Sequence, residues 1–471
     1  MRSLTERDAD MRVGYIIDHP KRDLPGGVMV AAALARRGVE TALIPLYEQA
    51  VDVPLLALDG LVVNFARPAN LDLVRGYAEA GLPVWVLDTE GGILADDGAN
   101  SPHRMASYVR DSSFADVLAG YFFWGSTLHQ AFIEHSGMSL DRLHLTGCPR
   151  FDYAAERWRD LLTFSMNNYV LVNANFPLVN PRFVQSPEAE LGTLLAAGWN
   201  ENYVTQLLDD SRQILRAYIE TVRRLAHRFP ERQFLLRPHP FENADFYQSE
   251  FQGLSNVIVN GAGSVLNVIN HAQCVLHLNC GTAIEAVLLD KLPLSMEFLN
   301  TKFMAGHSSL PSRVSQCLAS EDALIEALEN LPAAHAAFPF AARHDELIQP
   351  WFHMNDGNAS DRVAEVIVQH LQQIGAPPRA PSLRRSLASS RRKSRPAQRL
   401  QAVAANLLGS RRSSALRAFM ASHRRDKQLD KNEAATAFAS AQRQGRGAGF
   451  ALRQALHPIT GASLASLLVA G

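Results

Sequence analysis

The chain has 471 residues, 47% of them hydrophobic, with 46 basic and 47 acidic side chains. This length and apolar content suffice for two packed domains. The first ten residues are polar and lack the apolar core of a signal peptide, and no apolar run approaches the roughly 18 residues that span a membrane. We therefore expect neither a signal peptide nor a transmembrane segment.

Charge is distributed unevenly along the chain. Residues 379–471 hold 18 Lys/Arg and three acidic residues, a net charge of +15, so the preceding part carries about −16 because the whole chain is −1. An acidic body argues against a nucleic-acid groove, so no nucleic-acid partner is expected. The four cysteines lack Cys-x-x-Cys spacing and no His-Glu-x-x-His motif is present, so we predict a reducing, cytoplasmic setting and no metal or other cofactor.

Short apolar runs alternate with amphipathic stretches in chain order. Strands are expected at 13–17, 39–45, 61–64, 84–88, 121–124, 143–145, 169–172, 233–236, 257–259, 272–278 and 292–296. Helices are expected at 27–37, 69–80, 126–136, 203–228, from 282 onward, and at 347–351 and 359–374. This alternation predicts an α/β chain with two parallel sheets, each with helices on both faces.

The pattern breaks near residues 153–168 and then restarts, which predicts two Rossmann-like domains facing across a cleft. We assign residues 11–160 to the first domain, 165–345 to the second, 346–375 to helices that cross back to the first, and 376–471 to a basic, Ala/Ser/Arg-rich extension that is partly disordered. Basic amphipathic stretches near 399–408 and 415–425 suggest an anionic membrane surface as a partner; an inert disordered extension is the alternative. In both cases we expect the core to fold without this C-terminal extension.

Two polar turns follow predicted strands of the second domain. Arg237-Pro238-His239-Pro240 comes directly after an apolar run, and Asn279 to Ala286 follows the next long run and opens a helix. Ligands of open α/β sheets bind beyond the carboxyl ends of the strands, and a helix N-terminus favours phosphate. The expected nucleotide and phosphate ligands are Arg237, His239, Gly281, Thr282 and Glu285, the last for a ribose.

Each of these residues also has a purely structural explanation. His239 lies between two prolines, and a satisfied turn histidine is the alternative to a phosphate donor there. Arg237 would pair with an acidic neighbour, and Glu285 would serve only the dipole of its helix. Asn175 and Asn180 follow the first strand of the second domain, where they either line the cleft or form turns of their own.

The first domain offers candidates for a general base. Asp88 and Glu90 follow a predicted strand and would share a face in extended backbone, where two like charges raise one pKa. Together with His239 they form the predicted catalytic set. Asp18, His19 and Arg22 follow the first strand and are expected to face the acceptor; a solvated loop is the alternative.

Six short motifs follow one another along the chain: Asp88-Thr89-Glu90-Gly91-Gly92, Gly147-Cys148-Pro149-Arg150-Phe151-Asp152, Asn173-Ala174-Asn175-Phe176 with Asn180, Arg237-Pro238-His239-Pro240, Asn279 to Ala286, and Trp351-Phe352 with Asp356-Gly357. Their order resembles the bacterial surface carbohydrate biosynthesis protein family, whose members are GT-B-like. The resemblance covers roughly residues 12–372. Cys148 stands where the family usually has asparagine. A more distant resemblance is to sialyl- and Kdo-transferase-like enzymes that use CMP-sugars, although Thr89 interrupts their acidic-acidic-Gly motif here.

The resemblance implies a glycosyltransferase of surface polysaccharide biosynthesis. It would move a sugar from a nucleotide-activated donor to a glycan or lipid-linked glycan acceptor, on the inner face of the cytoplasmic membrane if the extension binds there. The more distant resemblance implies a CMP-linked donor. A UDP-sugar 2-epimerase-like enzyme and a non-catalytic polysaccharide-assembly protein share this architecture and remain alternatives.

Overall fold

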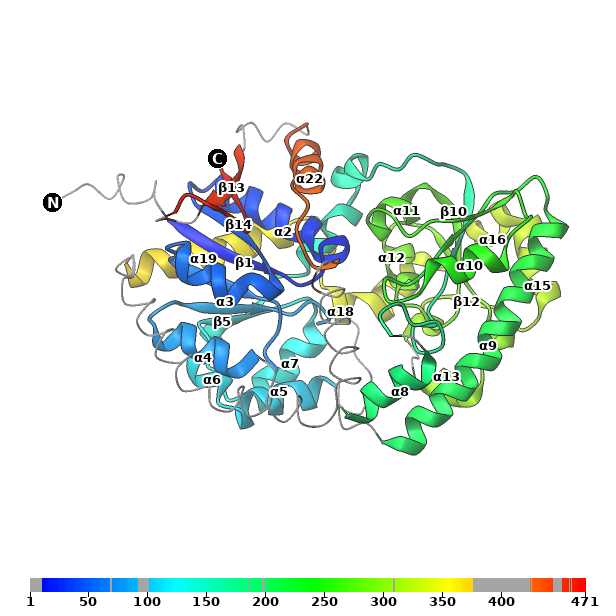
Figure 1. The fold of residues 1–471 in the computed structure, drawn as a ribbon, viewed down its shortest axis with the longest axis horizontal. Coiled ribbons are helices and arrows are strands. Elements are labelled where there is room, and N and C mark those ends of the chain that lie inside the picture. The colour runs from blue at the N-terminus through cyan, green and yellow to red at the C-terminus, as the bar shows by residue number, and fades with distance from the viewer. Residues whose placement is uncertain are drawn as a thin grey trace. The chain divides into compact units, whose positions relative to one another are not determined.

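The computed structural model describes residues 11–67, 70–91, 101–184, 186–196, 200–307, 310–375, 424, 426–443, 451–456, 458 and 460–471. The chain divides into two compact units: unit 1 is Met1–Tyr153 with Gln349–Gly471, and unit 2 is Ala154–Ile348. Each unit is built on its own sheet (Figure 1). The predicted α/β class, with two Rossmann-like parallel sheets, is confirmed.

The sheet of unit 1 has the order β13-β14-β2-β1-β3-β4-β5-β6. Its strands are β1 (Arg12–Ile17), β2 (Glu40–Pro45), β3 (Gly60–Val63), β4 (Val84–Leu87), β5 (Gly120–Phe123), β6 (Leu143–Leu145), β13 (Ala451–Leu456) and β14 (Ser463–Ala470). Strands β1 to β6 are parallel, and the hairpin β13–β14 joins β2 in antiparallel fashion. The order reverses between β1 and β3, which is the topological switch point of this doubly wound arrangement.

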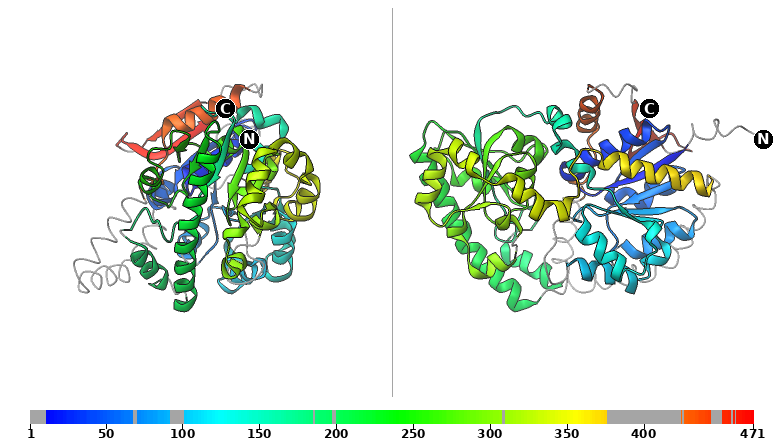
Figure 2. Two further views of the ribbon diagram at one scale, coloured as in Figure 1. Left: turned by 90° about the vertical axis from the view of Figure 1, so that its right-hand side faces the viewer. Right: turned by 180° about the vertical axis from the view of Figure 1, so that it is seen from behind.

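Helices cover both faces of this sheet (Figures 1 and 2). Alternate residues of β4 face opposite sides: Val84 and Val86 join the core cluster that contains Tyr77 of α4, whereas the Trp85 ring meets His370 of α19 at 5.4 Å. The helices of unit 1 are α2 (Pro20–Ala35), α3 (Gln49–Asp52), α4 (Leu71–Glu79), α5 (Pro102–Asp111), α6 (Phe114–Val117), α7 (Ser126–His135), α18 (Gln349–Phe352), α19 (Ala359–Ile374) and α22 (Lys431–Arg443).

Helix α2 begins seven residues earlier than the sequence pattern predicts. Pro20 occupies its first turn, where the fixed φ of proline suits a helix and its missing N–H costs nothing. The helix then continues through Pro25 and the pair Gly26-Gly27. A Cβ on Gly26 would come within 2.9 Å of the Arg150 nitrogen, so close packing accounts for that glycine.

The C-terminal segment returns to unit 1, which the sequence analysis did not anticipate. Strand β14 extends the sheet beyond β2 and buries Leu467, Leu468 and Val469. Ser466 donates from its amide and its hydroxyl to Asp52 (3.0 and 2.5 Å). Burying three such side chains contributes on the order of 5 kcal/mol, so this segment belongs to the fold of unit 1.

The sheet of unit 2 has the order β12-β11-β10-β7-β8-β9, and all of its strand pairs are parallel. Its strands are β7 (Tyr169–Asn173), β8 (Phe234–Arg237), β9 (Val257–Val259), β10 (Ala272–His277), β11 (Leu292–Ser295) and β12 (Gln316–Cys317). This is the Rossmann order, with its switch point between β7 and β10. Strands β7 and β8 are buried at every position, which explains their continuous apolar sequences.

Helices of unit 2 connect these strands, and the 28-residue helix α9 runs along its outer side (Figure 1). They are α8 (Pro187–Ala196), α9 (Glu201–Arg228), α10 (Ala244–Glu250), α11 (Val265–His271), α12 (Thr282–Leu288), α13 (Lys302–His307), α14 (Leu310–Arg313), α15 (Glu321–Glu329), α16 (Leu331–Ala337), α17 (Phe340–Arg343) and the π-helical turn η9 (His344–Ile348). Asn200 caps α9 by accepting from the Tyr203 amide at 3.0 Å.

Candidate functional site

The two polar turns of unit 2 meet at the switch point between β7 and β10. Asn173, at the end of β7, donates from Nδ2 to the Thr282 hydroxyl at 2.7 Å. Asn175 donates to the Asn279 carbonyl at 2.8 Å, and the Ala174 amide donates to the Arg237 carbonyl at 3.0 Å. The structure therefore joins the ends of β7, β8 and β10 through hydrogen bonds at the edge where ligands of such sheets bind.

Arg237 is buried at this edge and shapes the neighbouring loop. Its guanidinium donates to the carbonyls of Ala262 and Gly263 at 2.7 and 2.6 Å. Burial lowers the pKa of Arg237 to about 10, although Glu285 opposes the shift, so the side chain stays positive at neutral pH. Its positive charge therefore lies at the carboxyl-terminal edge of the sheet, and its hydrogen bonds fix the conformation of the loop that contains Ala262 and Gly263.

His239 is oriented by its own turn. Its Nδ1 accepts from the Phe241 amide at 3.2 Å, so the proton of the neutral ring lies on Nε2. A histidine in this tautomer donates from Nε2, as a ligand of a leaving-group phosphate must. The ring is half-buried and lies edge-on to the Phe241 ring, with centroids 5.4 Å apart.

Glu242 is a residue that the sequence analysis missed. Its carboxylate accepts from the amides of His239 (2.6 Å) and Phe176 (3.1 Å) and from the Tyr247 hydroxyl (2.6 Å). Burial raises the pKa of Glu242 to about 7 despite these hydrogen bonds. The side chain fixes the His239 turn to the loop after β7. The only sequence signal was a glutamate two residues after the second proline of that turn.

The turn at the start of α12 is more constrained than the sequence suggested. The Ala283 amide donates to the Cys280 carbonyl at 3.1 Å, because the chain already turns there, and is therefore engaged within the turn. The Thr282 hydroxyl donates to Cys280 Sγ at 3.1 Å, and sulfur is a weak acceptor that a phosphate oxygen would readily replace. Helix α12 is seven residues long, and Glu285 lies buried within its first turn.

The two asparagines after β7 have different positions. Asn175 lines a cavity of about 170 Å³ with Phe176, Leu278, Asn279 and others at the same edge of unit 2. Asn180 donates to the Asn243 carbonyl at 3.0 Å and accepts from the Asn243 amide at 3.1 Å. Asn175 therefore faces a cavity at the edge of the sheet, whereas Asn180 joins two loops.

The predicted residues of unit 1 form one charged cluster at the β1/β3 switch point. Arg22 donates to Asp18 at 2.6 Å and to Asp23 at 2.8 Å, and lies 3.5 Å from Glu90. Arg67, in the loop after β3, donates to Glu90 at 3.0 Å. Residues that follow β1, β3 and β4 are thus brought together at one edge of this sheet.

Asp88 and Glu90 differ in environment rather than forming a matched pair. Asp88 is buried, accepts from the Tyr121 hydroxyl at 3.2 Å and lies 3.5 Å from Arg67. Burial raises the pKa of Asp88, with the charge of Glu90 a smaller cause, and Arg67 opposes the shift. Glu90 lies in the turn beyond the strand with half of its side chain exposed. Of the two carboxylates, Glu90 is therefore the one that is open to solvent.

The C-terminal segment contributes a cation to this cluster. Lys427 is buried, pairs with Asp18 and lies 5.5 Å from the centre of the Tyr47 ring. Burial alone would raise the pKa of Asp18, but Arg22 and Lys427 hold it below its ordinary value. Burial and the same two cations lower the pKa of His19 to about 4, so its ring is neutral at pH 7.

Among the described residues, no group of three or more His, Cys, Asp or Glu side chains is arranged to hold a metal ion. In the same part of the chain, no helix combines the length and apolar character that crossing a membrane requires. Cys148, Cys274 and Cys280 are buried thiols, whereas Cys317 is exposed.

Solved structures resemble this chain in fold at low sequence identity. The UDP-GlcNAc 2-epimerase from Neisseria meningitidis bound to UDP-GlcNAc is 13% identical, with a TM-score of 0.47 over 76% of this chain and 100% of that one. The UDP-GlcNAc 2-epimerase from Methanocaldococcus jannaschii is 11% identical, with a TM-score of 0.46 over 76% and 100%. The wall teichoic acid polymerase TagF is 11% identical, with a TM-score of 0.48 over 79% and 92%. No protein-family model and no curated protein matches the sequence.

Proposed function

We propose that this protein is a glycosyltransferase of bacterial surface polysaccharide biosynthesis that binds a nucleotide-sugar donor on unit 2. The observation that carries the proposal is the β7/β10 switch point. There a buried arginine, a histidine with its Nε2 proton oriented by the backbone, and a glycine-threonine turn lie at the ends of β8 and β10, the two strands that pair with β7. Hydrogen bonds from Asn173 and Asn175 hold the glycine-threonine turn, and Glu242 links the His239 turn to the loop after β7. These groups suit a nucleoside phosphate, since they combine fixed positive charge with directed N–H donors.

In this proposal the donor phosphate is stabilised as the glycosidic bond breaks. His239 Nε2 and the amides of Gly281 and Thr282 donate to the departing phosphate, and Arg237 supplies charge from below. Glu285 accepts from the ribose hydroxyls. The transition state resembles an oxocarbenium ion, so negative charge accumulates on the leaving group as the bond lengthens.

Unit 1 supplies the acceptor side in the same proposal. Glu90 is the preferred base because its carboxylate is half-exposed, whereas Asp88 is enclosed and bonded to Tyr121. Asp18, His19 and Arg22 would orient the acceptor glycan. Transfer of the acceptor proton to Glu90 accompanies attack on the donor sugar.

Incubation of the protein with a panel of CMP-, UDP- and CDP-linked sugars and a glycan acceptor tests this function. Free nucleotide together with a new glycoside is the expected result. A changed sugar still attached to its nucleotide would instead indicate an epimerase, and binding without turnover a non-catalytic assembly protein. Thermal unfolding with each nucleotide identifies the donor class beforehand, because a ligand of the native state raises its stability.

We also propose that the protein acts at the inner face of the cytoplasmic membrane, through basic residues that lie outside the described part of the chain. Residues 379–423 hold 11 Lys/Arg and no acidic residue. Each such cation near an anionic leaflet contributes about 1 kcal/mol. Co-sedimentation with phosphatidylglycerol vesicles, lost at high salt and absent with phosphatidylcholine vesicles, is the expected result.

A further inference from the structure

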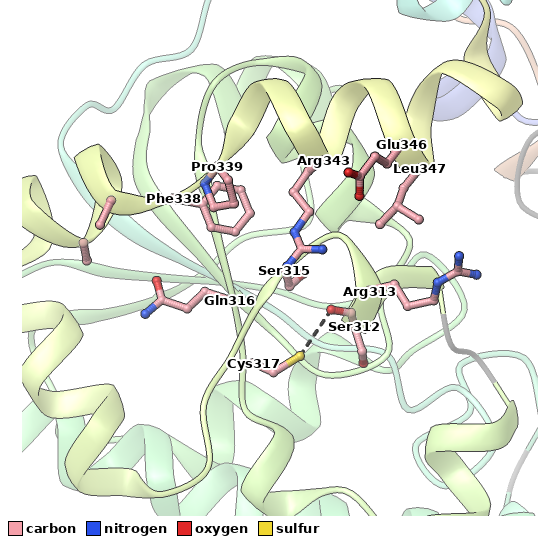
Figure 3. Close-up of a pocket in the computed structure, with 12 residues that line it drawn as sticks. Ser312, Arg313, Ser315, Gln316, Cys317, Phe338, Pro339, Arg343, Glu346 and Leu347 are labelled. Atoms are coloured by element: carbon pink, nitrogen blue, oxygen red, sulfur yellow. Dashed lines mark hydrogen bonds between the residues drawn. The ribbon is translucent and has the colours of Figure 1, made fainter.

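A second cavity of unit 2 lies apart from the residues assigned to the donor. It measures about 580 Å³. One wall is formed by α14 and the edge strand β12, and the other by α16, α17 and η9 (Figure 3). No residue of the two polar turns lines it.

The charged groups of this cavity are Arg313, Arg343 and Glu346, a net charge of +1. Figure 3 shows the Arg343 guanidinium directed from the helical wall toward Ser315, whereas that of Arg313 points to the side and Glu346 lies further along the helical wall. Within the described residues, Arg343 Nε has no hydrogen-bond partner, and no carboxylate forms an ion pair with this side chain. The positive charge of Arg343 is thus not compensated by an ion pair among the described residues, and an anion that enters the cavity would meet this charge in the guanidinium fork.

The uncharged residues of the cavity indicate what kind of molecule would carry the anionic group. Phe338 and Pro339 form an apolar surface beside Arg343, and the Phe338 ring is itself fixed edge-on against Phe340, with centroids 4.7 Å apart. Gln316 adds a half-buried amide on the opposite wall. A rigid aromatic surface next to a cation suits a small molecule that carries one acidic group on an apolar or planar body.

We propose that this cavity binds a small organic anion, a carboxylate or a phosphate monoester, with Arg343 as its principal anchor. The site goes beyond the proposed transferase function and does not depend on it. Carboxylate and phosphate share the fork geometry that a guanidinium recognises, so the class is defined by an oxyanion joined to an apolar group.

An occupant would contact a network that reaches the donor edge. Ser312 lines the cavity and donates to Glu297 at 3.0 Å. Asn300 donates to the other oxygen of Glu297 at 2.8 Å and exchanges hydrogen bonds with Asn279 at 3.0 and 3.1 Å. Asn279 has a left-handed φ of 50° and begins the Gly281-Thr282 turn, so its conformation depends on these partners.

Alkylation of the Cys317 thiol can report whether a ligand occupies this cavity. Its thiol lines the cavity and donates to the Ser312 carbonyl at 3.2 Å, and the other three cysteines are buried. Iodoacetamide should therefore modify Cys317 in the folded protein, and a bound anion should block it. At a ligand concentration ten times the dissociation constant, the rate should fall by about tenfold if the occupied form is protected.

The experiment measures alkylation of Cys317 by mass spectrometry in the full chain, with phenyl phosphate, benzoate and uncharged phenol as probes. We expect saturable protection by at least one anion, with the comparison of the two identifying the acidic group, and none by phenol. Arg343→Gln should abolish that protection. Arg228→Gln, which removes an exposed arginine paired with Glu329, should retain it.

Thermal unfolding of Cys317→Ser with the protective anion gives a second measurement that does not need the thiol. A rise in the unfolding temperature that disappears in the Cys317→Ser/Arg343→Gln double variant supports the site. Absence of protection by both anions, equal protection by phenol, or protection that persists in Arg343→Gln would overturn the proposal. None of these readouts uses enzymatic activity, so failure here is distinct from failure of the proposed function.

Discussion

Replacing Glu242 with glutamine should remove a pH-dependent part of the stability of unit 2. Burial raises the pKa of Glu242 from its ordinary value of 4.5 to about 7, although the Tyr247 hydroxyl and the amides of His239 and Phe176 stabilise the charged form. One pH unit of difference between folded and unfolded pKa corresponds to about 1.4 kcal/mol. The rise from 4.5 to about 7 therefore corresponds to about 3 kcal/mol.

The direction of this pH dependence follows from which state, folded or unfolded, binds the Glu242 proton more tightly. The folded protein holds the Glu242 proton more strongly than the unfolded chain does, so the contribution to stability is fully present below pH 4.5 and is lost as the pH rises through 7. Glutamine cannot ionise and removes this dependence. Its amide also places a donor where the carboxylate accepted one, which costs about 1–3 kcal/mol at every pH.

Urea unfolding of both proteins at pH 5, 6, 7 and 8 provides the measurement. We expect the variant to be less stable at pH 5 and to recover about 2.5 kcal/mol relative to the wild type by pH 8, because the wild type has already lost part of the contribution at pH 5. Other buried carboxylates such as Asp152 contribute equally to both proteins and cancel in the difference. Glu231→Gln, at an exposed position in the turn before β8, is the matched control and should show no such recovery. A difference between wild type and Glu242→Gln that stays constant from pH 5 to 8 would refute the reasoning.

Three further changes test the remaining assignments. His239→Ala should lower sugar transfer by about 10²-fold or more because a directed donor to the leaving group is lost, while the unfolding temperature stays unchanged; full activity would remove this role. Glu90→Gln should abolish transfer and leave nucleotide affinity within a few-fold, since the residue belongs to unit 1; a collapse of nucleotide binding would place Glu90 at the donor. A chain that ends at residue 423 should lose on the order of 5 kcal/mol of unit 1 stability with β14, and an unchanged urea midpoint would contradict the burial argument.

The central strands were predictable because burial leaves a direct trace in the sequence. Strands enclosed on both faces, such as Val84–Leu87 and Phe234–Arg237, are apolar at nearly every position, and their observed ends differ from the predicted ones by a residue or so. The start of α2 was not predictable in the same way. Pro20, Pro25 and the glycine pair are ordinary turn signals, and only packing against β1 and Arg150 reveals why a helix passes through them.

The candidate site shows a similar division between local and distant information. The turns around His239 and Gly281 could be predicted from the sequence because each follows an apolar strand. The Rossmann order of the sheet then brings the two turns together. The role of Glu242 could not be predicted from the sequence. It depends on the amide of Phe176 and the hydroxyl of Tyr247, and only the folded sheet defines the positions of these groups. The same applies to Arg67, which lies between Asp88 and Glu90 only because β3 and β4 are neighbours.

The C-terminal segment changes how the membrane proposal has to be tested. Among its cations, Arg424 donates to both oxygens of Glu48, Lys427 pairs with Asp18, and Arg453 pairs with Glu40, so these charges are already neutralised within unit 1. The electrostatic case therefore depends mainly on the 11 Lys/Arg of residues 379–423. Ending the chain at residue 378 would remove β14 and Lys427 together with those charges, and a loss of vesicle binding would then have two causes. Replacing Arg391, Arg392 and Lys393 with glutamine removes charge while leaving the paired cations and the sheet intact, so weaker vesicle binding by this variant can be assigned to the basic segment, and unchanged binding would exclude a contribution from these three cations.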